Sequence, residues 1–192
     1  MAETQPALLP ETRSRLEAIF ATFAARGDES YGEAVSQIEH AVQSAEIAEA
    51  AGAPDSLIAA ALLHDIGHMV HRDAGDAFRR GRDDAHERLG EKYLAGLFPL
   101  SVTRPIALHV AAKRCLVVTE PAYAAGLSAV SRRTLDLQGG PMSDAEVADF
   151  LADPHGADAI ALRRIDEAAK VDGAGRGGVA RFRPLLERLA CR

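Results

Sequence analysis

Apolar residues recur at intervals of three and four along most of this chain, and that spacing constrains its fold more than any other feature. Alanine and leucine dominate the recurring positions, as at Ala41, Ala45, Ala48 and Ala51. The alternation of apolar and polar residues that marks a half-buried strand is almost absent. Because residues three and four apart share one face of a helix, the pattern predicts an all-α fold in which helices bury their apolar faces against one another.

Turn and capping residues divide the periodic pattern into ten expected helices. Gly52 and Pro54 end one helix, and Asp55 is the expected N-cap of the next. Ser143 and Glu146 predict a capping box further along the chain. The expected helices span residues 14–25, 31–51, 55–70, 85–97, 101–114, 122–127, 128–135, 143–152, 157–170 and 179–189.

Two short motifs resemble phosphate-binding signatures but have simpler explanations. Residues 173–178 formally match G-x-G-x-x-G, yet the dinucleotide fingerprint needs a preceding strand, and a helix is expected there instead. Residues 79–84 carry arginines followed by aspartates, and this mixture of charges predicts a solvated loop.

The charge balance narrows the classes of partner. The chain has 28 acidic and 22 basic side chains, a net charge of −6, whereas a nucleic-acid binder usually carries a basic face. The longest apolar run, residues 57–63, is far shorter than the ~20 residues that span a bilayer. The N-terminus lacks the features of a secretory signal, and Cys115 and Cys191 fit no disulfide or zinc pattern. We therefore expect a cytoplasmic protein that binds neither nucleic acid nor membrane.

An adjacent histidine and aspartate, His64 and Asp65, stand at the end of the most apolar helix. Burying both side chains is costly unless something compensates them. A divalent metal ion does so, because imidazole nitrogen and carboxylate oxygen suit iron, manganese and similar ions. His68 shares the helix face of His64 if the helix continues past the break expected at Gly67. The pair alone is weak evidence, since a satisfied core histidine is commoner than a ligand.

Further histidines and an aspartate on separate expected helices strengthen the metal hypothesis. Helical bundles commonly build two-metal sites from residues that point inward from facing helices. Six candidates are enough for two metal ions that share a bridging carboxylate: His40, His64, Asp65, His86, His109 and Asp166. His71 and His155 lie in polar surroundings and are expected at the surface.

The order of these residues resembles the HD-domain superfamily, whose usual members are metal-dependent phosphohydrolases. Three segments are more similar to the HD-type mixed-valent di-iron oxygenases, and within them to the PhnZ-like enzymes that split the carbon–phosphorus bond of hydroxylated aminoethylphosphonates. These segments are residues 32–40, 109–114 and 131–142. We accordingly expect a single HD domain over residues 1–192, a helical bundle with its core at about residues 31–170 and helical extensions at both ends.

The resemblance implies two iron ions, Fe²⁺ and Fe³⁺, with Asp65 bridging them. The first iron would be bound by His40, His64, Asp65 and Asp166, and the second by His86, His109 and Asp65. Five side chains would hold the phosphonate oxygens: Lys113, His68, Ser131, Thr134 and Gln138. Glu33 and Tyr31 would control how the substrate's amino end and dioxygen approach the metal site.

Helical spacing agrees with several of these roles. Lys113 lies one turn after His109, which would place a cation beside a metal ligand. Ser131, Thr134 and Gln138 form one polar stripe, for which a solvent-facing surface is the alternative explanation.

The segment before His40 differs from the family pattern at one position, that of a tyrosine. Glu33 lies seven residues before His40 and hence on the same face of the expected helix. The PhnZ-like enzymes have a tyrosine three residues before this glutamate, where this chain has Ser30, and Tyr31 stands two residues before it. On a helix the difference is a rotation of about 100°, so the N-substitution of the substrate's amine stays open. A trimethylammonium group would suit an aromatic wall through cation–π contact.

Three functions are consistent with the pattern. The resemblance implies an oxygenase that uses dioxygen to cleave (R)-1-hydroxy-2-aminoethylphosphonate or its N-trimethyl analogue, releasing phosphate and glycine or glycine betaine. The alternative is a metal-dependent phosphohydrolase acting on a nucleotide or another phosphate ester, in which the metal activates water. A mononuclear site needs about four ligands, so six candidates favour the oxygenase. A non-catalytic binding module has little reason to keep all of them together with Lys113.

Overall fold

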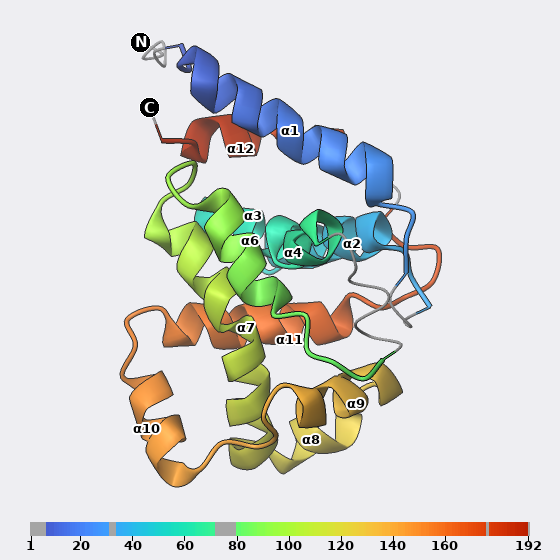
Figure 1. Ribbon diagram of the computed structural model, residues 1–192, viewed down its shortest axis with the longest axis vertical. Coiled ribbons are helices and arrows are strands. Elements are labelled where there is room, and N and C mark those ends of the chain that lie inside the picture. The colour runs from blue at the N-terminus through green and yellow to red at the C-terminus, as the bar shows by residue number, and fades with distance from the viewer. Residues whose placement is uncertain (1–6, 31–33, 72–79, 176, 192) are drawn as a thin grey trace.

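The computed structural model describes residues 7–30, 34–71, 80–175 and 177–191, and the regular elements in these ranges are helices (Figure 1). The all-α prediction is confirmed, and each expected helix has a counterpart. The elements are α1 (Pro10–Arg26), α2 (Gln37–Ala50), α3 (Asp55–Leu63), α4 (Ile66–Val70), α6 (His86–Leu94), α7 (Leu100–Thr119), α8 (Pro121–Gly126), α9 (Ala129–Leu137), α10 (Asp144–Leu151), α11 (Gly156–Ala168), the 3₁₀ helix η1 (Val179–Phe182) and α12 (Arg183–Leu189). The extent of a single domain over residues 1–192 stays a prediction.

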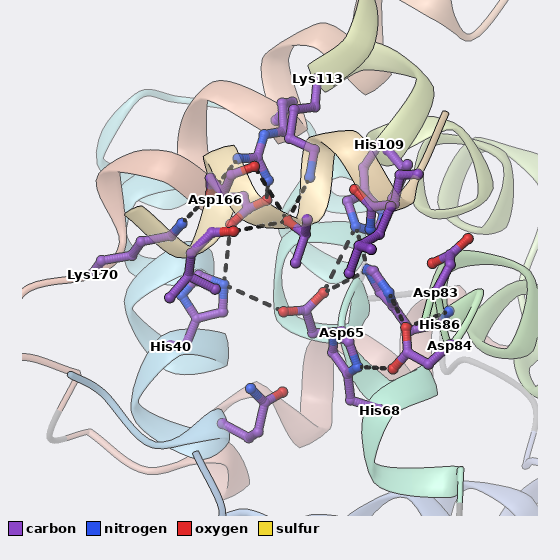
Figure 2. Close-up of a pocket in the computed structure, with 18 of the residues that line it drawn as sticks. His40, Asp65, His68, Asp83, Asp84, His86, His109, Lys113, Asp166 and Lys170 are labelled. Carbon is purple, nitrogen blue, oxygen red and sulfur yellow. Dashed lines mark hydrogen bonds and ion pairs between the residues drawn. The ribbon is translucent and has the colours of Figure 1, made fainter. Parts of the chain in front are cut away.

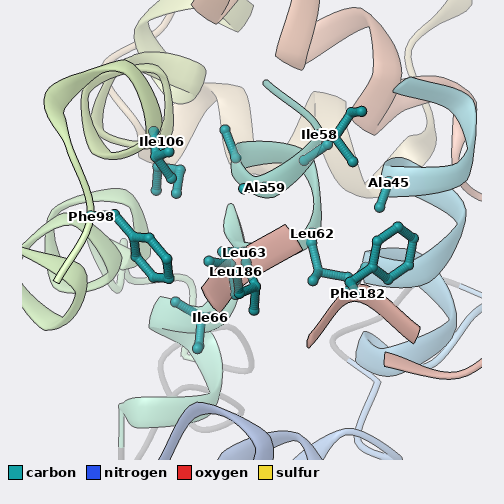
Figure 3. Packing of buried hydrophobic residues seen from close by; sticks show 14 of the residues in the cluster. Ala45, Ile58, Ala59, Leu62, Leu63, Ile66, Phe98, Ile106, Phe182 and Leu186 are labelled. Atoms are coloured by element: carbon teal, nitrogen blue, oxygen red, sulfur yellow. The ribbon is translucent and has the colours of Figure 1, made fainter. Parts of the chain in front are cut away.

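Helix α3 is the centre of the larger apolar core. It packs against α2, α7, α11 and α12, and residues 59–63 have no exposed surface. Figure 3 shows part of this core, which includes Leu62, Leu63, Phe182 and Leu186. A helix that is apolar on all sides needs burial on all sides, and each fully buried leucine contributes about 1.5–3 kcal/mol.

Helix α7 connects this core to the other end of the molecule. It contacts α3 and α6 in the core, crosses α11, and contacts α8 and α10 at its far end (Figure 1). A second, smaller apolar cluster lies there between α7, α10 and α11 and includes Cys115, Met142 and Phe150. Helix α9 lies at the same end and buries only Ser131 and Leu135 among its own described residues.

Helix α2 begins later than expected. It starts at Gln37 and not at residue 31, because Ser36 forms a capping box in which its hydroxyl accepts from the Glu39 amide. Residues 34–36 are not helical. The argument that placed Glu33 on the helix face of His40 is therefore wrong. Glu33 and Tyr31 themselves lie outside the described residues.

The expected helix at residues 55–70 is broken at His64 and Asp65, not at Gly67. Helix α3 ends before His64, Asp65 has φ −98° and ψ 8°, and α4 starts at the next residue. His64 and His68 consequently do not share one helix face. Gly67 has another role, because a Cβ atom added there would lie 1.9 Å from the backbone oxygen of His86. The glycine lets α4 approach the start of α6.

The remaining expectations about the fold have mixed outcomes. The capping box of Ser143 and Glu146 is present. Asp55 is the first residue of α3, and Pro54 occupies the N-cap without a side-chain bond, so the expected Asp55 cap is wrong. The described part of residues 173–178 is a loop, as predicted. None of the described helices is both long enough and apolar enough to cross a membrane.

Candidate metal centre

Three side chains from three parts of the fold form a first group of potential metal ligands. His40 belongs to α2, His64 follows α3 and Asp166 belongs to α11. Nε2 of His40 lies 3.1 Å from Nε2 of His64 and 3.3 Å from Oδ1 of Asp166. Nε2 of His64 lies 3.8 Å from the same oxygen. All three residues are buried and converge closely enough to hold one ion.

A second group is formed by His86, the first residue of α6, and His109 of α7 together with Asp65. The Nε2 atoms of the two histidines lie 3.0 Å apart. Oδ1 of Asp65 lies 3.5 Å from Nε2 of His86 and 3.7 Å from Nε2 of His109. Asp65, His68 and His86 also offer ligand atoms within 4.8 Å of one another. Nδ1 of His68 is bonded to Asp84 at 2.5 Å, and His109, whose Nε2 lies 3.0 Å from that of His86, is the third donor that the sequence predicted.

Asp65 faces both groups (Figure 2). Its Oδ2 lies 3.6 Å from Nε2 of His40, and its Oδ1 lies 3.5 Å from Nε2 of His64 and 3.5 Å from Nε2 of His86. In a continuous helix the adjacent side chains of residues 64 and 65 would diverge by about 100°. The break between α3 and α4 lets both enter one cluster. The fold thus brings together all six predicted ligands, whose binding of metal stays a prediction.

The four histidines of the two groups each use Nδ1 in a hydrogen bond to an acceptor. Because Nδ1–H donates, the lone pair of Nε2 is left free for a metal ion. The acceptors are the backbone oxygens of Ala169 for His40 at 2.7 Å, Ala61 for His64 at 2.8 Å and Ile106 for His109 at 2.7 Å, and the carboxylate of Asp84 for His86 at 3.0 Å.

The charges of the cluster also suit a cation. Burial disfavours the imidazolium form, which lowers the pKa of His64 and holds the pKa of His109 well below its ordinary value. Burial alone would raise the pKa of Asp65 and Asp166, but neighbouring histidines and, for Asp166, the Arg163 guanidinium hold both pKa values below the usual range. Burial would lower the pKa of His40, but its contact with Asp166 raises it, so a metal ion would displace a proton from this ring. Imidazole nitrogens and ionised carboxylates are a donor set that fits iron or manganese.

A cavity beside the metal cluster contains the predicted phosphonate contacts. Its lining includes His68, Lys113, Ser131, Thr134 and Gln138, so the polar stripe of α9 faces the cavity and not only solvent. Lys113 is 3% exposed and donates from Nζ to Oγ1 of Thr134 at 3.0 Å. Burial and the nearby Arg163 lower the pKa of Lys113 to about 7. Oε1 of Gln138 is buried and has no hydrogen-bond partner among the described residues.

Ser131 belongs to a buried network that sequence reasoning missed. Its Oγ donates to Glu167 at 2.9 Å and accepts from Lys170 at 2.9 Å and from Arg163 at 3.1 Å. Arg163 also donates to Asp166 and Glu167. Arg163 and Lys170 stand three residues before and four after Asp166. That helical spacing places them near Asp166 and was the signal that could have identified them.

Asp84 was also missed. Its side chain is only 10% exposed, lines the cavity and bonds to His68 and His86, so the expectation of a solvated loop is wrong for this residue. It stands just before α6, at the side where α4 packs against that helix. Burial alone would lower the pKa of His86, but the bond to Asp84 and the charge of Asp65 raise it to about 9. His71 and His155, which were expected at the surface, are not part of the cavity lining.

The amino-acid sequence of this chain is similar to one known domain family and to several known proteins. Residues 37–129 match the HD domain family. The chain is 44% identical over 161 residues to hydroxymethylphosphonate dioxygenase of Gimesia maris, an alignment that covers 83% of this chain and 80% of that protein. It is 41% identical over 175 residues to 1-hydroxy-2-(trimethylamino)ethylphosphonate dioxygenase (glycine-betaine-forming) of Leisingera caerulea, with 91% and 89% covered. An uncharacterized protein of Acanthamoeba polyphaga mimivirus is 36% identical over 148 residues, with 76% and 67% covered.

Proposed function

The chain belongs to the HD-domain oxygenases that act on phosphonates, and we propose that it uses dioxygen to cleave the carbon–phosphorus bond of a 1-hydroxyphosphonate. One observation carries the proposal. Asp65 joins two groups of histidine and carboxylate donors, and the same cavity contains a buried lysine, Lys113, bonded to Thr134. The cavity thus combines metal donors with groups that bind an anion.

The resident metals of this proposal are two iron ions. His40, His64, Asp65 and Asp166 would hold the first, and His86, His109 and Asp65 the second. Within each group neighbouring donor atoms lie 3.0 to 3.8 Å apart. Neighbouring ligands with bonds of about 2.1 Å to one ion lie about 3 Å apart, so the donors fit. When bound, the irons would supply the redox chemistry that activates dioxygen.

The protein's side chains would bind and orient the phosphonate. Lys113 and Thr134 would donate to its oxygens, and Ser131, Gln138 and His68 would complete the contacts. A lysine ammonium binds such a group as a compact point charge. A dianion beside Lys113 would favour its protonated form and offset the effect of burial on its pKa. The carbon that carries the hydroxyl group would then face Asp65 and the metal ligands.

The substrate would be (R)-1-hydroxy-2-aminoethylphosphonate or its N-trimethyl analogue, and the products phosphate and glycine or glycine betaine. The reaction balances with one dioxygen, because R–CH(OH)–PO₃H₂ and O₂ give R–COOH and H₃PO₄ without another reductant. The dioxygenase names of the two curated relatives and the second group of donors support this reaction over hydrolysis of a phosphate ester. Glu33 and Tyr31 would act at the amine end of the substrate.

A substrate panel tests the proposal. Iron-loaded protein is assayed in air and without oxygen against the amino and trimethylamino hydroxyphosphonates and hydroxymethylphosphonate, with a nucleoside monophosphate as the control. We expect phosphate from at least one hydroxyphosphonate in air alone and none from the nucleotide. Oxygen-independent release of phosphate from the nucleotide would contradict the proposal and support a phosphohydrolase.

A further inference from the structure

Asp84 holds two histidines with one carboxylate. Its Oδ1 accepts from Nδ1 of His86 at 3.0 Å, and its Oδ2 accepts from Nδ1 of His68 at 2.5 Å (Figure 2). The two rings are stacked, with centroids 3.9 Å apart and planes 18° apart. His86 belongs to the second donor group, and His68 lines the cavity. Asp84 therefore connects the proposed second metal site with the wall of the substrate pocket.

The backbone around Asp84 is fixed by several independent contacts. Ala85 has φ 50° and ψ 38°, a left-handed conformation that residues other than glycine rarely adopt. Oδ1 of Asp83 accepts from the Ala85 amide at 3.2 Å, and Oδ1 of Asp84 accepts from the His86 amide at 3.4 Å. Gly67 of α4 lies directly against the His86 carbonyl. These contacts hold the Asp84 carboxylate at the Nδ1 atoms of the two rings, and backbone strain of this kind is typical of functional sites.

The acceptor distinguishes His86 from the other three histidines of the two donor groups. His40, His64 and His109 donate to neutral backbone oxygens, whereas His86 donates to a carboxylate. Both kinds of acceptor fix which ring nitrogen faces the metal. A carboxylate also polarises the ring and makes the opposite nitrogen a stronger ligand. The first donor group depends on no such carboxylate, so the two groups should respond differently to the loss of Asp84.

We propose that Asp84 is the positioning residue of the second metal site, directing Nε2 of His86 towards Asp65 and His109 and holding His68 against the same ring. This inference rests on the proposed function for the presence of two metal ions. It assigns no chemical step to Asp84. The same carboxylate also orients His68, whose side chain lines the pocket.

Zinc binding tests the proposal without turnover. Metal-free wild-type, D84A, D84N and D83N proteins are titrated with Zn²⁺ by calorimetry. The wild type should bind two ions per chain. D84A should bind the first ion normally and the second 10- to 100-fold more weakly, which is the usual effect of losing a carboxylate behind a ligating histidine. D84N has the same shape and keeps one acceptor oxygen, so it should lose less. D83N is the matched control, because the asparagine oxygen can still accept from the Ala85 amide and the hydrogen bond described for Asp83 involves neither histidine.

Nitrogen-15 NMR of the diamagnetic zinc-loaded proteins supplies a second readout. The wild type and D83N should show His86 with a proton on Nδ1 and zinc on Nε2, and D84A should lose this signature while His40 and His64 keep theirs. Wild-type affinity for two ions in D84A would overturn the proposal, as would binding of only one ion by the wild type. Equal weakening of both sites, or the same effect in D83N, would show a merely structural role and overturn it too. Failure of carbon–phosphorus cleavage would leave these readouts unchanged, so the two proposals fail separately.

Discussion

Oδ1 of Asp65 lies 3.5 Å from Nε2 of His86, although Asp65 stands in the break between α3 and α4 and His86 opens a different helix. Oδ2 of the same carboxylate lies 3.6 Å from Nε2 of His40. One side chain thus reaches both donor groups. Its removal should affect both metal sites at once, which no other candidate ligand would do.

Asp65→Ala should abolish phosphate release. Without the carboxylate two cations would lie close together with less compensation, and Coulomb repulsion disfavours that arrangement. Iron analysis after anaerobic loading should show a loss from both sites, whereas His109→Ala should lose iron from the second site alone. Normal turnover by Asp65→Ala would remove Asp65 from the bridging role.

Lys113→Ala should weaken substrate binding and leave the metals in place. A charge-assisted contact is worth ~1.5–3 kcal/mol, so the apparent KM should rise roughly 10- to 150-fold. Lys113→Arg should recover only part of the loss, because a planar fork replaces a point charge. Lys92→Ala, on an exposed position of α6, is the control and should change neither KM nor iron content. An unchanged KM in Lys113→Ala would show that this lysine does not bind the phosphonate.

Glu167→Gln should weaken the attachment of α9 to α11 and lower the free energy of unfolding. Glu167 accepts from the Ser128 amide at 2.8 Å, from Ser131 at 2.9 Å and from Lys170 at 3.1 Å, and α9 buries little apolar surface of its own. Glu167 is partly buried, so removing its charge should cost roughly 1.5–3 kcal/mol, which urea unfolding measures. Glu120→Gln, which breaks the exposed pair with Arg164, should cost less than about 1 kcal/mol. Equal losses in the two variants would contradict this account of α9.

Gly67→Ala should displace the second donor group. The added Cβ would lie 1.9 Å from the His86 carbonyl oxygen, so the backbone of α4 or of α6 must move. Zinc titration should show one tight site in place of two, with the loss confined to the site of His86 and His109. Gly126→Ala, where a Cβ meets nothing within 4 Å, should bind as the wild type does. Two unaltered sites in Gly67→Ala would show that His86 does not depend on this close approach.

The helical class, the order of the helices and the convergence of six candidate ligands could all be anticipated from the sequence. Helix periodicity depends on local spacing, which a sequence displays directly. The late start of α2 was also readable, because Ser36 and Glu39 have the same spacing as the capping box of Ser143 and Glu146. Periodicity alone extended that helix too far towards its N-terminus.

Contacts between distant elements could not be anticipated in the same way. Asp84 stands in a run of mixed charges that is typical of a solvated loop, yet it is half-buried and bonds to His68 of α4 and His86 of α6, two helices that pack together. The helix breaks at His64 and Asp65, although neither position is a proline or a glycine that would predict a break. The break places both side chains in one cluster. This cluster forms only because other helices bring His40, His86 and Asp166 to the same place, and that contact is not visible in the local sequence.

The ratio of dioxygen consumed to phosphate released tests the central claim most directly. Iron-loaded protein is mixed with the hydroxyphosphonate that the substrate panel identifies, and both quantities are followed in the same sample. The balanced reaction predicts one dioxygen per phosphate and no phosphate when oxygen is removed. Phosphate released at the same rate without oxygen would contradict the account.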